Sequence, residues 1–382
     1  MQIARVRTRI VNVPLRIPFD HATKSRSATE NVVTEVELSD GSTGIGEGVP
    51  REYVTGESAR SAHAAIAGLD YGELAPGFAS LGDLVSYLAE RDPPPVGNAA
   101  WCSLELALLD AFGKSLGRPI GEVAPLVLPP EMVAPRSRVR YGVVVSGGAS
   151  RKRVRRAARY RLFGFNEMKV KVGLDDDDDV AALAAIRRRV GNRVDLRVDA
   201  NGVWDADRAA RMCERLSPFT VSCVEQPLPT GSEGDLPRLR GSTDTPIMLD
   251  ESLNSLGAAR RAVAGGWCDV FNVRISKLGG FVASLKAARI ADEAGLKYAL
   301  GCQVGETAIL SAAGRHFAAT VGGIRYLEGS YDRFLLAANV TRRPVSFGWG
   351  GFARAMRGPG LGIEIHQAAL DALTTELRDI EL

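Results

Sequence analysis

Polar and apolar residues alternate along the N-terminal part of the chain. The runs that begin at Ile3 (IARVRTRIVNVPL) and Glu30 (ENVVTEVEL) have the period of two that is typical of half-buried strands, and SDGSTG at 39–44 is a turn signal. Helical spacing follows, most clearly over residues 97–117, where the last glycine is a typical helix stop. The pattern predicts a small α+β domain over residues 1–130, which a proline-rich run separates from the rest.

The remainder of the chain has a different pattern. Eight short, β-branched apolar runs alternate with helical segments, and their starts are roughly 22 to 28 residues apart, the length of a strand, a helix and two loops. This spacing predicts a parallel (β/α)8 barrel over residues 131–340. The glycine-rich tail, 341–382, reads as a return across the first domain. The predicted strands begin at 139, 166, 194, 221, 246, 268, 296 and 323.

Composition narrows the classes of function. The chain has 382 residues, which favours one large and one smaller domain, with 45% hydrophobic residues, 24% charged residues and a net charge of +3. So small a charge argues against nucleic acid or membrane partners, and no apolar run approaches the ~20 residues of a membrane span. Five scattered cysteines argue against disulfides and zinc. We expect a cytoplasmic protein that acts on a small molecule.

Carboxylates close three consecutive predicted strands: Asp199, Glu225 and Asp250. The C-terminal strand ends of a barrel meet at one mouth, where the active site lies, so these oxygens can converge on one point. Three anions packed together need a hard cation, and an all-oxygen set suits Mg²⁺, with Mn²⁺ as an alternative. Asn201 and Glu251 follow two of these strands and are expected to contact the ligands.

Three lysines accompany the carboxylates. Lys169 and Lys171 lie two apart on one strand, so they share a face and lower each other's pKa, which allows one of them to act as a base. Lys277 follows a strand four further round and is expected to face the substrate from the opposite side. A metal that holds a carboxylate favours loss of its α-proton because it stabilises the enediolate. Glu306, just past the seventh strand, is a further candidate at the mouth.

Five consecutive aspartates, Asp175 to Asp179, resemble a metal site at first reading. They follow a predicted strand and precede the helical run VAALAAIRRRV. Anions at a helix N-terminus stabilise the helix dipole and cap free amides. We therefore expect solvated capping residues and place the metal elsewhere.

The motifs together resemble the enolase superfamily, and within it the muconate-lactonizing-enzyme subgroup of the mandelate racemase/muconate lactonizing enzyme family. The resemblance implies a capping α+β domain over a (β/α)7β barrel, one Mg²⁺ held by Asp199, Glu225 and Asp250, and often a homo-oligomer. It also implies acid/base roles for Lys171 and Lys277, with Lys169 tuning Lys171. The motifs are KVK at 169–171, DAN at 199–201, VEQP at 224–227, DES at 250–252 and SKLGG at 276–280.

The resemblance further implies that cap loops near 16–30 and 48–58 close over the substrate and set specificity. These segments carry Lys24, Arg26, Arg51 and Tyr53. A cationic lid suits a carboxylate substrate with a second anionic group.

The reaction remains open among several kinds of α-proton chemistry. Racemisation or epimerisation of an amino acid derivative or dipeptide is the first reading, because lysines are expected on both faces of the substrate. A cycloisomerase of the muconate-lactonizing type comes next, since it needs one lysine for the proton. An o-succinylbenzoate synthase or dehydratase and a non-catalytic scaffold on a degenerate barrel are further alternatives. Gly329 and Tyr331 stand where dipeptide epimerases carry an Asp-x-Asp pair, a departure from that class.

Overall fold

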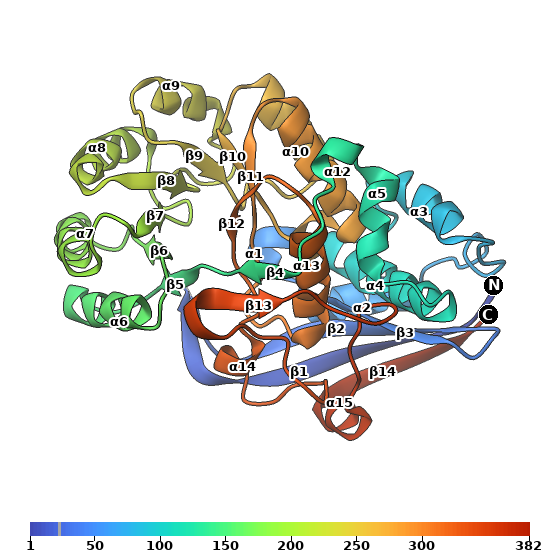
Figure 1. Cartoon of the computed structure of the whole chain (residues 1–382). Helices are drawn as coiled ribbons and strands as arrows, with labels where there is room; N and C mark the ends of the chain where they lie inside the picture. The colour runs from blue at the N-terminus through green and yellow to red at the C-terminus, as the bar shows by residue number, and fades with distance from the viewer. Residues whose placement is uncertain (22–23) are drawn as a thin grey trace.

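A computed structural model describes residues 1–21 and 24–382, with side chains described outside 17–26. The capping sheet is antiparallel in the order β14-β1-β2-β3 and includes both ends of the chain. Figure 1 shows β14 (red) beside the long blue strand β1, with the two termini close together. The strands are β1 (Ile3–His21), β2 (Lys24–Leu38), β3 (Thr43–Gly48) and β14 (Thr374–Glu381).

The cap also contains helices, and the longest of them packs directly on the backbone of this sheet. A Cβ on Gly46 of β3 would lie 2.0 Å from the carbonyl oxygen of Ser103, and Gly44 and Gly48 face the same helix equally closely. Only glycine permits this approach. The cap helices are α1 (Glu52–Thr55), α2 (Ala59–Ala67), α3 (Leu81–Ala89), α4 (Asn98–Ser115) and α5 (Ala124–Val127).

Eight parallel strands form the barrel sheet in the order β12 to β5, so all eight predicted strands are present. The backbone amide of Gly142 donates to Leu327 O at 2.8 Å and links the first strand to the last. The strands are β5 (Val143–Val145), β6 (Glu167–Lys171), β7 (Asp195–Asp199), β8 (Val221–Glu225), β9 (Ile247–Leu249), β10 (Val270–Val273), β11 (Lys297–Leu300) and β12 (Ile324–Leu327).

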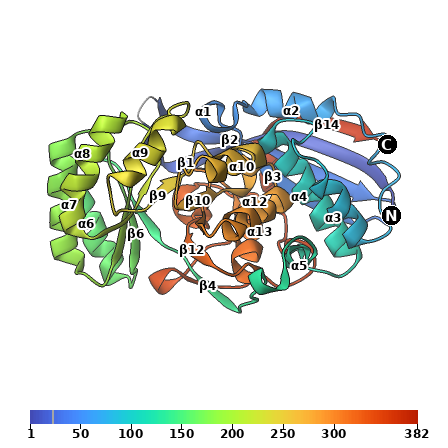
Figure 2. The ribbon, with the colours of Figure 1, turned by 90° about the horizontal axis from the view of Figure 1, so that it is seen from above.

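A crossover helix follows each of the first seven barrel strands, which gives the expected (β/α)7β order. Figures 1 and 2 place α6, α7 and α8 at the end of the molecule farthest from the termini. The helices are α6 (Ser150–Leu162), α7 (Asp176–Val190), α8 (Ala206–Leu216), α9 (Leu236–Gly241), α10 (Leu256–Ala264), α12 (Phe281–Glu293) and α13 (Ala308–Thr320). None of the described helices is long and apolar enough to cross a bilayer.

Two segments differ from the sequence prediction. The run from 139 is divided into β4 (Arg138–Arg140), which pairs with β13 (Phe352–Arg354), and the barrel strand β5. The expected cap loop at 16–30 is instead the end of a long hairpin, because β1 and β2 continue to its tip. The remaining elements are α11 (Ile275–Leu278), α14 (Asp332–Leu335) and α15 (Gln367–Leu373).

The cap is joined to the barrel mouth by a buried carboxylate. Glu47 of β3 accepts hydrogen bonds from the amides of Thr307 and Leu310, at the N-terminus of α13. This places an anion where the helix dipole and the free amides favour it. Nearby, Asn31 Nδ2 donates to Gly305 O at 2.9 Å. The sheet of the cap is thereby held against the loop that follows β11.

Candidate active site

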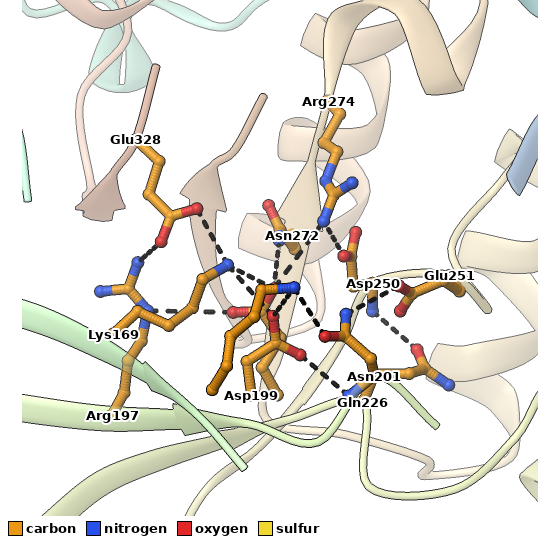
Figure 3. A network of polar contacts seen from close by, with 12 residues as sticks. Lys169, Arg197, Asp199, Asn201, Gln226, Asp250, Glu251, Asn272, Arg274 and Glu328 are labelled. Carbon is orange, nitrogen blue, oxygen red and sulfur yellow. Dashed lines mark hydrogen bonds and ion pairs between the residues drawn. The ribbon is translucent and has the colours of Figure 1, made fainter. Parts of the chain in front are cut away.

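The three predicted carboxylates lie side by side at the carboxyl ends of their strands. Asp199 and Glu225 are register partners at the ends of β7 and β8, and Asp250 directly follows β9. All three are buried. The three strand ends are therefore adjacent, as expected, and cationic side chains lie between the carboxylates (Figure 3).

Lys169 is the central cation of this network. Its Nζ donates to Glu225 Oε1 at 2.9 Å and lies 2.9 Å from Glu328 Oε2 and 3.5 Å from Asp199 Oδ2. Burial by itself lowers the pKa of Lys169, but the three carboxylates outweigh it and raise the pKa above its ordinary value. Lys169 is thus a fixed, buried ammonium.

Two members of this network are not among the catalytic and metal residues that the sequence predicted. Glu328 directly follows β12, so the rule of strand-end position could have identified it. Arg197 is buried within β7, donates to Glu167 Oε1 at 3.0 Å and to Glu328, and stacks 4.4 Å from the ring of Tyr326. A buried arginine inside a strand is a signal for such a partner, because its charge must be paired.

Lys171 lies on the same face of β6 as Lys169, as expected, but closer to the mouth. Its side chain is 26% exposed, against 4% for Lys169. Its Nζ donates to Asn201 Oδ1 at 2.7 Å and lies 3.7 Å from Asp199 Oδ2. Asn201 in turn donates to Glu251 Oε1 at 3.2 Å. The predicted neighbours Asn201 and Glu251 are therefore connected to Lys171.

Lys277 is fully buried beside Asp250. It belongs to the helical turn α11, its side chain has no exposed surface, and its Nζ donates to Asp250 O at 2.5 Å, Asp250 Oδ1 at 2.8 Å and Asn272 O at 2.9 Å. Burial and the neighbouring Arg274 lower the pKa of Lys277 well below its ordinary value, and its position opposite Lys171 across a substrate stays a prediction. The turn of α11 directs the side chain beneath Asp250, because a helical residue does not follow the alternation of a strand.

Arg274 directly follows β10, at the mouth end of the strand. Its Nη2 donates to Asp250 Oδ2, and its Nη1 donates to Gln303 Oε1 at 2.8 Å. Nη2 also lies 3.9 Å from Glu225 Oε1. Figure 3 shows the side chain of Arg274 extending toward Asp250. Sequence reasoning missed this residue, although it directly follows the sixth barrel strand.

Two family models match the chain. The N-terminal domain of mandelate racemase / muconate lactonizing enzyme matches residues 3–123, and the enolase C-terminal domain-like model matches residues 152–369. The chain belongs to the mandelate racemase/muconate lactonizing enzyme family. This places it in the enolase superfamily, and the family and barrel predictions are confirmed.

Relatives in this family are isomerases of more than one kind. The L-Lys-D/L-Arg epimerase of Methylococcus capsulatus is 30% identical, over 95% of this chain and 99% of the relative. Muconate cycloisomerase 1 of Pseudomonas putida is 29% identical, over 93% of each chain. The structure of a dipeptide epimerase from Cytophaga hutchinsonii, in complex with Mg and D-Ala-L-Val, has a TM-score of 0.87 and 26% identity over the full length of both chains. The predicted isomerase class is confirmed at the level of the family.

The carboxylates fit a magnesium ion by their chemistry. Glu225 Oε2 and Glu251 Oε2 are buried and accept no hydrogen bond within the described part of the chain. Buried carboxylate oxygens without a partner are costly unless a cation or water satisfies them. Across residues 1–21 and 24–382, no three acidic, histidine or cysteine side chains stand close enough to hold one ion as placed, because Lys169 and Arg274 extend between the carboxylates.

The remaining predicted residues have different surroundings. Burial raises the pKa of Glu306 to about 8, and its Oε1 accepts from Gln303 N at 2.7 Å. Arg51 is buried and donates to Pro50 O and Val304 O, so it joins the cap to the barrel instead of lying in solvent. Tyr53 is 48% exposed. The side chains of Lys24 and Arg26 are outside the described residues.

The aspartate run forms a helix cap, with one exception. Asp175 is the N-cap of α7 and accepts from Asp178 N at 2.9 Å. Asp179, in contrast, is buried; it accepts from Arg153 Nη1 and from Gly173 N, both at 2.6 Å. The expectation of solvated caps is therefore wrong for Asp179, which takes part in a buried ion pair between α6 and α7.

Proposed function

We propose that this protein is an Mg²⁺-dependent isomerase that removes the α-proton of a carboxylate substrate. The observation that carries the proposal is the position of Lys171, a partly exposed amine 3.7 Å from Asp199, beside carboxylates on three successive strands. Asp199, Glu225 and Asp250 would hold the ion. When bound, Mg²⁺ stabilises the negative charge that develops on the substrate carboxylate.

Lys171 acts as the base in this reaction. The C–H bond of the α-carbon breaks, its electron pair stays on the substrate, and the proton moves to Nζ of Lys171, from which it can return to carbon. Lys169 keeps its charge and its position because three carboxylates surround it. Its role is to hold Glu225 and Asp199 in place and to add positive charge beside Lys171.

Two kinds of isomerisation fit this chemistry. Racemisation or epimerisation of an amino acid derivative is supported by the M. capsulatus relative, and it requires proton transfer on both faces of the α-carbon. Cycloisomerisation is supported by the P. putida relative and requires one face only. The five free cysteines suit a reducing, cytoplasmic setting.

Metal binding is tested by calorimetric titration of Mg²⁺ into three charge-to-amide variants. Asp250→Asn should lower Mg²⁺ affinity by at least ~10-fold, because it removes a charged ligand. Asp177→Asn is the matched control, since that side chain is 90% exposed and pairs with Arg215. Equal Mg²⁺ affinity in wild type and in both Asp199→Asn and Asp250→Asn would refute the assignment of the ligands.

Activity is tested by deuterium uptake in D₂O, read by mass, with L-Lys-L-Arg and muconolactone as probes. Wild type should incorporate solvent deuterium at the α-carbon of at least one probe, and Lys171→Ala should reduce the rate by at least ~10²-fold, the scale of a lost general base. Uptake that persists in Lys171→Ala would remove this lysine from the mechanism.

A further inference from the structure

We propose that a basic and aromatic face around β4 and β13 docks this protein on an anionic lipid surface. The proposal goes beyond the proposed function and does not depend on it. A net charge of +3 argues against such a partner only if the charge is spread evenly over the chain, and it is not. The docking face consists of Arg138, Leu162, Phe163, Trp349, Phe352 and Arg354.

Two segments of the chain contain no acidic residue. Residues 132–166 hold 10 lysines and arginines and residues 333–363 hold 5, so together they have 15 of the 48 basic residues and none of the 45 acidic ones. The remainder, with 33 basic and 45 acidic residues, has a net charge of −12. The two segments meet where β4 pairs with β13 and where Gly350 N donates to Phe163 O at 2.8 Å. Their positive charge is therefore brought together at one region of the surface.

Two arginines stand directly opposite each other on the ribbon of β4 and β13. Arg138 and Arg354 are register partners, both are exposed, and neither forms an ion pair within residues 1–21 and 24–382. Like charges opposite each other on two strands destabilise the pairing. Arg138 and Arg140 each place Cζ 4.8 Å from the centre of the Phe352 ring. An exposed guanidinium whose charge is not compensated is well suited to bind a phosphate group, because its planar fork matches the phosphate oxygens.

Large apolar side chains lie beside these arginines. Leu162 ends α6 and is 71% exposed, Phe163 follows it and is 50% exposed, and Trp349 is 67% exposed. The rings of Phe163 and Trp349 meet edge to face, with their centroids 5.5 Å apart. Gly350, with a φ of 63°, turns the chain after Trp349 so closely that a Cβ there would lie 3.2 Å from Gly164 O. The apolar side chains are thus held in place although they are exposed.

An anionic bilayer fits both the charge and the apolar side chains of this face. Tryptophan and phenylalanine favour the level of the headgroups, an exposed leucine gains by burial at the acyl boundary, and arginines beside them bind lipid phosphates. A nucleic acid offers no apolar layer for Leu162, and the ring of Phe352 is already in contact with two guanidinium groups. A second copy seated on the same face about a two-fold axis would bring like charges together.

The docking face lies at the end of the barrel opposite the carboxylates. Arg140 precedes β5 and Phe163 precedes β6, so both are at the amino-terminal ends of barrel strands, whereas Asp199 and Glu225 are at the carboxyl ends. Figure 2 shows β4 at the edge of the molecule, on the side away from α1 and α2. A bilayer on this face leaves the mouth free for a soluble substrate.

Vesicle sedimentation tests the contribution of charge. The full-length protein is mixed with vesicles of phosphatidylcholine alone or of equal parts phosphatidylcholine and phosphatidylglycerol. It should bind only the anionic vesicles, and added salt should weaken binding because it screens the attraction. Arg138→Gln/Arg354→Gln should weaken binding at least ~10-fold, since each basic residue at an anionic surface contributes. Arg60→Gln is the matched control, because that arginine of the cap is 82% exposed. Failure of wild type to bind anionic vesicles would overturn the proposal.

Tryptophan fluorescence tests the contribution of the apolar side chains. Trp101 and Trp204 are buried, so a blue shift on adding anionic vesicles should come mainly from Trp349. Trp349→Ser should abolish the shift and weaken sedimentation with anionic vesicles at least ~10-fold, because it removes the largest apolar side chain of the face. Leu126→Ser, at a 51% exposed leucine of the cap, is the control and should bind as wild type does. A blue shift that persists in Trp349→Ser would contradict the proposal.

Two further measurements distinguish the other occupants. Binding of a single-stranded oligonucleotide that is tighter than binding of anionic vesicles at the same salt, and is lost in Arg138→Gln/Arg354→Gln, would assign the face to nucleic acid. A lower molecular mass of Trp349→Ser than of wild type by light scattering would assign it to contacts between copies of the chain. Either result would overturn the lipid proposal. Circular dichroism checks that each variant is folded, and equal mass with weaker vesicle binding is the expected result.

Discussion

Lys169 Nζ lies 2.9 Å from Glu225 Oε1 in a buried contact. This contact distinguishes Lys169 from Lys171, the second lysine on the same face of β6. Lys169 is enclosed by carboxylates, whereas Lys171, which lies two residues further along the strand and nearer the mouth, is partly exposed. The two lysines look equivalent in the sequence, but their surroundings in the structure differ. We expect stability to depend on the first lysine and chemistry on the second.

Lys169→Met should lower the free energy of unfolding by about 3 kcal/mol, because it removes one of the buried cations that pair with Glu225 and Glu328. Lys171→Met should change it by less than ~1 kcal/mol, as for a partly exposed pair, while abolishing deuterium uptake. Urea unfolding followed by circular dichroism measures both. Equal losses of stability in the two variants would contradict this division.

Asp179→Asn should destabilise the protein by about 3 kcal/mol, because it breaks one side of the buried pair with Arg153. The adjacent control, Asp177→Asn, removes a contact between exposed side chains and should cost less than ~1 kcal/mol. Thermal unfolding of both variants under the same buffer conditions is the measurement. Similar unfolding midpoints for the two variants would show that Asp179 behaves as a solvated capping residue.

Gly46→Ala should cost about 3 kcal/mol, since the new Cβ would lie 2.0 Å from Ser103 O and force α4 away from β3. Gly234→Ala is the control, because a Cβ there meets nothing within 4 Å. Chemical denaturation compares the two. A Gly46→Ala variant as stable as wild type would show that the sheet and helix can separate at little cost.

Unfolding should become easier in mild acid because of His316. Burial lowers the pKa of His316 from 6.5 to about 4, and its Nε2 lies 3.2 Å from Leu361 O. The unfolded chain binds the proton first, so this contribution to stability is complete above pH 6.5 and is lost as the pH falls toward 4, by about 3 kcal/mol in all. Unfolding measured across this range should show a shallower pH dependence in His316→Gln. If the pH dependence of unfolding is identical in wild type and His316→Gln, other titrating groups cause the loss of stability in acid.

The sequence determined the barrel and the positions of the carboxylates. Strand runs recur at a spacing set by local geometry, and a residue that ends a parallel strand must lie at the mouth whatever its neighbours are. The eight strands and the placement of Asp199, Glu225 and Asp250 at neighbouring strand ends followed from these two facts. The placement of Lys169 and Lys171 on one face followed from the period of two in a strand.

Only the tertiary structure decided how deeply each cation near the carboxylates is buried. Lys277 and Arg274 are three residues apart, and a single helical turn after β10 buries the first and leaves the second at the rim. The same holds for Asp179, which is one of five identical residues in sequence but is buried where it meets Arg153 from α6. A local pattern fixes the direction of a side chain within its own element. Its burial depends on which other element packs there, and that is decided by contacts distant in the chain.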